Sequence, residues 1–154
     1  MSGGAFEAAT GDGPPPPAEE AEQRSREVRA AWEGLLQIRR LSRRDGGEPG
    51  ALPAEWERRQ PVRAIALALE AAKTPPSAVD PAGARVATGY RVTAGERPGT
   101  AVVEWLGPPA GGAAGEAEPA LTRLVPALER CGWEALLYRG PRGRRFLEVE
   151  PLGG

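Results

Sequence analysis

The chain has 154 residues, 40% of them apolar and 27% charged, with a formal net charge of −1. This length suits one folded core of roughly 100 to 120 residues, while 21 glycines and 17 prolines indicate additional unstructured segments. A nearly neutral chain has no overall field that would draw it to DNA or to an acidic membrane.

The single cysteine cannot form an internal disulfide, which favours a reducing compartment. No apolar run approaches the ~20 residues of a membrane span, and the N-terminus lacks the features of a signal peptide. We therefore expect a cytoplasmic protein with no membrane partner.

The first 17 residues combine glycine, proline and alanine with a few acids. They offer too little apolar surface to offset the entropy of ordering, so a disordered acidic tail is predicted. A helical region over residues 18–73 follows. Its first part predicts an amphipathic helix over residues 18–44, because apolar residues recur at steps of three and four, namely Val28, Ala31, Trp32, Leu35 and Ile38.

A second helical segment begins at Pro53, where proline suits a first turn. Pro61 either kinks this segment or opens a new helix with its own apolar stripe. The two parts of the helical region are expected to pack as an antiparallel pair. Closely spaced prolines over residues 74–83 disfavour both helix and central strand, so this stretch is predicted to be a linker.

The remaining residues, 84–154, are predicted to form a second unit. Alternating apolar residues over 86–93 and 100–106 are typical of a β-hairpin, and a second hairpin is predicted from residues 133–138 and 145–150. Between the hairpins we expect a flexible loop over 107–118 and a helix with Pro119 in its first turn. The fold class is therefore α+β, an N-terminal helical pair followed by a ββαββ unit with a four-stranded, mainly antiparallel sheet.

Each predicted unit carries one tryptophan, which we interpret as a core anchor: Trp32, Trp56, Trp105 and Trp133.

The C-terminal half contains four motifs: GYRV at Gly89–Val92, VVEW at Val102–Trp105, LERCGW at Leu128–Trp133 and FLEVEP at Phe146–Pro151. In these motifs it resembles small uncharacterised proteins of high-GC actinobacteria. The resemblance covers that half alone, implies no known activity and carries no site residues across. With Lys73 as the sole lysine and no asparagine, the composition also indicates a high-GC bacterial genome.

The sequence offers little catalytic chemistry. It has no histidine, which removes the commonest general base and the commonest transition-metal ligand. Cys131 is predicted to lie at a helix C-terminus, where the helix dipole raises the pKa of a thiol, so we interpret it as a small apolar residue. With no zinc-type cysteine cluster and no phosphate-binding glycine loop, no catalytic, cofactor-binding or metal-binding residue is predicted. The protein is expected not to be an enzyme, and a small histidine-free enzyme is the least favoured alternative.

Arginines gather at two places that could bind a partner. A hairpin patch surrounds the tip of the second hairpin and consists of Arg139, Arg142, Arg144, Arg145, Tyr138 and Phe146. A secondary basic patch is expected at the end of the first helix from Arg39, Arg40, Arg43 and Arg44. One hypothesis is a nucleic-acid-binding accessory protein that uses residues 139–145 to contact phosphates. The bias towards arginine throughout the chain weakens this hypothesis.

The favoured hypothesis is a non-catalytic protein-interaction or regulatory module whose partner is another protein or a second copy of the chain. A four-stranded sheet with one helix leaves a face to be covered, and the outer strand of the terminal hairpin offers an edge for strand addition. Three carboxylates along the hairpin, Glu134, Glu148 and Glu150, are expected to pair with some of its arginines.

Overall fold

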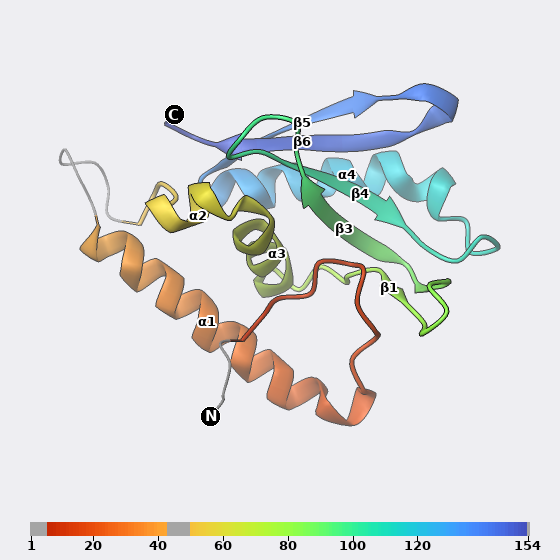
Figure 1. Ribbon diagram of the computed structural model, residues 1–154, viewed down its shortest axis with the longest axis horizontal. Coiled ribbons are helices and arrows are strands. Elements are labelled where there is room, and N and C mark those ends of the chain that lie inside the picture. The colour runs from red at the N-terminus through yellow and green to blue at the C-terminus, as the bar shows by residue number, and fades with distance from the viewer. Residues whose placement is uncertain (1–5, 43–49, 154) are drawn as a thin grey trace.

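The computed structural model, which describes residues 6–42 and 50–153, contains a four-stranded antiparallel sheet with helices against one face (Figure 1). The sheet has the order β3-β4-β6-β5, and its strands are β3 (Gly89–Ala94), β4 (Ala101–Leu106), β5 (Trp133–Arg139) and β6 (Arg145–Pro151). The helices are α1 (Ala21–Leu41), α2 (Glu55–Arg59), α3 (Pro61–Ala71) and α4 (Ala113–Arg130). The structure also has two short 3-10 turns. The first, η1 (Ala18–Glu20), precedes α1, and the second, η2 (Pro141–Gly143), forms the tip of the β5–β6 hairpin. The predicted α+β class is confirmed.

The ββαββ unit is not confirmed in its predicted form, because the predicted first strand is divided. Its beginning forms β2 (Arg85–Ala87), which pairs with β1 (Ala78–Val79) in a separate two-stranded sheet. The stretch predicted as a linker therefore contributes a strand. At Gly89, where β3 begins, an added Cβ would lie 2.1 Å from the carbonyl oxygen of Pro75. Only glycine permits this close crossing of the two segments.

The helical region has the predicted helices, with two refinements. Pro61 opens α3 as its first residue and does not kink a longer helix. α1 packs on α3 through a small apolar cluster that contains Val28, Leu35 and Leu67, with Trp32 and Trp56 beside it. The first helix was predicted over residues 18–44, whereas α1 ends at Leu41, and Arg43 and Arg44 lie outside the described residues.

Helix α4 begins at Ala113, so the prediction of a loop up to residue 118 is wrong. Pro119 and Pro126 both lie inside the helix, where each lacks the N–H of a helical hydrogen bond. The apolar stripe of α4 starts with Ala113 and Ala117, which are both buried. Burial of this stripe against the sheet outweighs the local cost of the prolines.

The core lies between the sheet and the two helices α3 and α4. The strands contribute alternate side chains, so that Val92 of β3, Val103 of β4 and Leu147 of β6 stand side by side in register. Trp133, the largest fully buried side chain, lies in the same cluster. Trp56 and Trp105 pack against it in part, which agrees with the interpretation of the tryptophans as core anchors.

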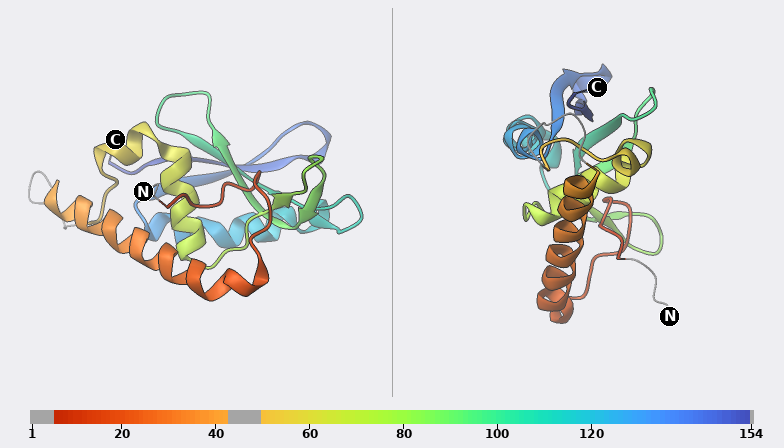
Figure 2. Two further views of the ribbon diagram at one scale, coloured as in Figure 1. Left: turned by 60° about the horizontal axis from the view of Figure 1, so that its bottom comes forward. Right: turned by 90° about the vertical axis from the view of Figure 1, so that its left-hand side faces the viewer.

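The prediction of a disordered tail is wrong for the part that the structure describes, from residue 6 onwards. Residues 6–13, which we call the N-terminal strap, cross α3 and β3 (Figure 2). Hydrogen bonds to its backbone hold the strap, since the Val92 N–H donates to the Thr10 carbonyl (2.8 Å) and the Tyr90 hydroxyl donates to the Ala9 carbonyl (2.8 Å). The Ala9 N–H donates to the Glu70 carboxylate (3.0 Å). These hydrogen bonds contribute to the free energy that orders the strap, in addition to the packing of Phe6 and Ala8.

Candidate interaction surface

The β5–β6 hairpin presents its two sides to different surroundings. Register pairs Tyr138 with Phe146 and Arg139 with Arg145, and neighbouring pairs point to opposite faces of the sheet. Arg139 and Arg145 reach Glu118 of α4, so their side is the one that the helices cover. Tyr138 and Phe146 stand on the opposite side, which we call the open face because no described helix packs on it (Figure 2).

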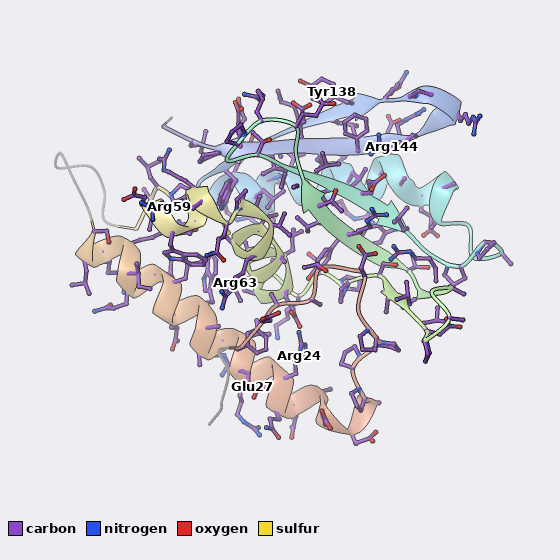
Figure 3. All side chains as sticks on the ribbon, viewed as in Figure 1. Arg24, Glu27, Arg59, Arg63, Tyr138 and Arg144 are labelled. Atoms are coloured by element: carbon purple, nitrogen blue, oxygen red, sulfur yellow. The ribbon has the colours of Figure 1, made fainter. Side chains whose placement is uncertain are left out.

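An aromatic and cationic stack lies on the open face near the tip. The rings of Tyr138 and Phe146 stack with centroids 5.8 Å apart and planes inclined by 20°. The guanidinium of Arg144 lies over the Phe146 ring at 4.4 Å from its centroid. Figure 3 labels Arg144 and Tyr138 on the hairpin. Arg144 also donates to Glu104 of β4 (2.9 Å), which fixes its direction along the face. The stack therefore presents a flat, preorganised surface in which the arginine charge is already balanced.

On the helix side, the single carboxylate of Glu118 pairs with two further arginines of the hairpin. Arg145 donates to its carboxylate at 2.9 Å and Arg139 approaches it to 3.7 Å. The hydrogen bond from Arg145, followed by the charge of Arg139, lowers the pKa of Glu118 below its ordinary value. These partners differ from the predicted ones, because Glu118 comes from a helix and Glu104 from another strand.

Arg142 occupies the tip of the hairpin in a left-handed conformation, with φ of 60°. It has no ion pair or hydrogen bond within the described residues. The structure thus gathers all six residues of the hairpin patch on one hairpin but divides them between two faces. Of its four arginines, three pair with two carboxylates, those of Glu104 and Glu118, and Arg142 pairs with none among the described residues.

Further along the open face, an exposed apolar strip continues from the stack. Leu136 is 49% exposed and Tyr138 is 40% exposed, and both belong to the outer strand β5. Arg97, from the β3–β4 loop, donates to Glu150 (2.9 Å) and lies 3.9 Å from Glu148. The hydrogen bond to Glu150 raises the pKa of Arg97. A hollow of about 90 Å³ lies between Arg97 and this strip.

The secondary basic patch does not form as predicted, because Arg39 is a buried residue with 4% of its surface exposed. Arg39 donates two hydrogen bonds to Glu57, at 2.8 and 2.7 Å, and two more to the carbonyls of Gly50 (3.0 Å) and Cys131 (2.9 Å). This clasp joins α1, α2 and the turn before β5. Arg40 is exposed and contacts Gln37 (3.2 Å). Arg43 and Arg44 lie outside the described residues.

A groove of about 480 Å³ between α1 and α3 was not anticipated from the sequence. Ala31, Leu35 and Trp56 line its floor, while Glu27 of α1 and Arg63 of α3 stand at its margin (Figure 3). Small residues at Ala30 and Gly34 leave the space open. In the sequence, the feature that could have indicated the groove is the pair of small residues, Ala30 and Gly34, beside the apolar stripe of α1.

Cys131 follows the last residue of α4, as predicted, and burial raises the pKa of its thiol. Such a thiol is a poor nucleophile at neutral pH.

Within residues 6–42 and 50–153, no three metal-ligating side chains come together, and no helix has the length and apolar character to cross a membrane. Searches against protein-family models, curated proteins and solved structures gave no match to this chain.

Proposed function

We propose that the chain is a non-catalytic protein-interaction or regulatory module of a bacterial cytoplasm, and that it binds a protein partner through the open face of its sheet. The observation that carries the proposal is the stack of Tyr138, Phe146 and Arg144 beside the exposed side chain of Leu136. Tyrosine and arginine are enriched in the centres of protein interfaces, where rigid aromatic rings contribute contact area at a low entropic cost.

The surroundings of the stack also suit a protein partner. Balanced pairs such as Arg97 with Glu150 and Arg144 with Glu104 surround the apolar strip with polar groups. A polar rim around an apolar centre is the usual anatomy of a protein interface. Pairing of three of the four hairpin arginines with carboxylates disfavours the alternative of a nucleic-acid-binding protein, because phosphate contacts need uncompensated positive charge.

Position-specific photocrosslinking in the source bacterium tests the proposal. A benzophenone amino acid replaces Tyr138, which is an aromatic position, and the matched control carries the same group at Val86, which is 45% exposed on the separate strand β2. We expect one discrete adduct with another protein from position 138 and none from position 86. Equal labelling from the two positions, or no protein adduct from position 138, contradicts the proposal.

A mobility-shift experiment with mixed DNA and RNA at low salt tests the nucleic-acid alternative. We expect no shift, because three of the four tip arginines, Arg139, Arg144 and Arg145, pair with the carboxylates of Glu104 and Glu118. A shift that disappears in an Arg142→Ala/Arg144→Ala/Arg145→Ala variant would instead favour nucleic acid as the partner.

A further inference from the structure

The two edges of the sheet differ in how their backbone groups are satisfied. At the β3 edge, Tyr90 donates its N–H to the Pro75 carbonyl (3.0 Å) and accepts from the Ser77 N–H (2.9 Å). The next outward-pointing donor of β3, the N–H of Val92, donates to the Thr10 carbonyl of the N-terminal strap. The chain therefore covers this edge with its own segments, which is one of the ways proteins prevent edge-to-edge association.

The β5 edge has no such cover within the described residues. Flanking bonds fix the pattern of the ladder, since Leu152 donates to the Gly132 carbonyl (2.9 Å) and Gly140 donates to the Arg144 carbonyl (2.8 Å). Hydrogen-bonded pairs alternate along an antiparallel ladder, so the even-numbered residues of β5 bond to β6. The odd-numbered residues, including Ala135 and Leu137, direct their N–H and C=O groups outwards, where no backbone group of residues 6–42 or 50–153 reaches them.

The composition of β5 also lacks the devices that protect an edge. The strand is seven residues long, WEALLYR, and it contains no proline, no lysine and no register shift against β6. Its two charged residues, Glu134 and Arg139, lie near opposite ends. An apolar edge of this length is a site at which another strand adds.

We infer that the occupant of this edge is a second copy of the chain, whose β5 pairs antiparallel about a two-fold axis through Leu136. This inference goes beyond the proposed function, because it uses the backbone edge of β5 and leaves the outer surface of the stack exposed on the open face. An axis through Leu136 pairs all seven residues of the strand. It also places Ala135 opposite the partner copy's Leu137, so that outward donors meet outward acceptors on both sides of the axis.

The side chains are complementary in the same register. Leu136 meets its own symmetry mate on the open face, and Glu134 lies opposite a tyrosine hydroxyl, that of Tyr138. Shifting the axis to Glu134 would place two carboxylates opposite each other, and shifting it to Arg139 would place two guanidinium groups opposite each other. Charge therefore disfavours these two registers, and the central register pairs more residues of β5 than any shifted one.

Sedimentation of the purified full chain over a range of concentrations tests the inference. We expect a concentration-dependent dimer, and Leu136→Lys should weaken it by ~100-fold because two ammonium groups would meet at the axis in place of two leucines. Val86→Lys is the matched control, since Val86 has a similar exposed fraction on β2, and it should dimerise as the parent chain does. A monomeric parent chain, or equal effects of the two substitutions, overturns the inference.

Disulfide trapping tests the register. Residues at a non-hydrogen-bonded pair have Cα atoms about 4.5 Å apart, a separation that a disulfide accepts. In a Cys131→Ser background, Leu136→Cys should form a covalent dimer on mild oxidation, while Val86→Cys should not. A dimer that resists trapping at position 136 rejects this interface. A monomeric chain that still yields a protein adduct from position 138 rejects the dimer and leaves the proposed function standing.

Discussion

The buried clasp between Arg39 and Glu57 gives the sharpest test of how this fold is held together. The side chains of the two residues are 2% and 0% exposed, and the guanidinium makes four hydrogen bonds. Arg39→Ala would leave the carboxylate of Glu57 buried with only the Ala54 N–H as a remaining partner (2.9 Å). Breaking a buried pair on one side costs about 3–5 kcal/mol, because an uncompensated charge stays in the interior.

A loss of this size is a large part of the ~5–15 kcal/mol by which domains are usually stable. Urea unfolding followed by circular dichroism measures it, and the neighbouring Arg40→Ala serves as the control. Arg40 lies one position further along the same helix but is exposed, so its loss should change the free energy of unfolding by no more than about 0.5 kcal/mol.

The double variant Arg39→Ala/Glu57→Gln separates the buried charge from the lost packing. If the unpaired carboxylate causes most of the damage, the uncharged amide should restore part of the stability that Arg39→Ala removes. The reasoning is refuted if Arg39→Ala costs less than about 1 kcal/mol, since the clasp would then be no stronger than a surface pair.

Three further predictions concern the strap and the thiol. Tyr90→Phe removes the hydroxyl that bonds Ala9 and should reduce stability by about 0.5–1.5 kcal/mol in urea unfolding; an unchanged midpoint would contradict it. Gly11→Ala should release the strap, because the residue has φ of 103° and an added Cβ would lie 2.4 Å from the Tyr90 carbonyl oxygen. Faster hydrogen exchange in residues 6–13 would show the release, and unchanged protection would count against it. Alkylation of Cys131 in the folded chain should have its pH midpoint above the ~8.5 of a free cysteine, because burial raises the pKa of the thiol. A midpoint at or below that value would show that the thiol is accessible to water.

Local sequence patterns predicted most of the secondary structure and missed the interactions between distant segments. The β5–β6 hairpin followed from alternation and from the glycines of its turn, which are signals within one short stretch. The N-terminal strap was missed because backbone groups of β3 and a carboxylate 61 positions away hold it. Its own side chains carry no pattern that indicates such partners.

The opposite roles of Arg39 and Arg40 show what the sequence could still have revealed. Arg39 continues the buried stripe of α1, four positions after Leu35, whereas Arg40 points away from that stripe. A charge on the apolar side of a helix needs a buried partner, so the helical period alone marked Arg39 for an internal ion pair. The helical pattern could not predict that the partner is Glu57, because that depends on how α2 packs against α1.

The arginines of the hairpin illustrate how position decides the role of a residue type that is abundant in this chain. Arg144 stacks on Phe146 and pairs with Glu104, while Arg145 bonds Glu118 on the other side of the same hairpin. Each carboxylate removes the attraction for a distant phosphate but preserves the flat guanidinium as a contact surface. Binding at such a surface depends on apolar contact and directed hydrogen bonds more than on net charge, so it should weaken little as salt is raised. This expectation distinguishes the proposed protein interface from a nucleic-acid site, whose affinity falls steeply with salt.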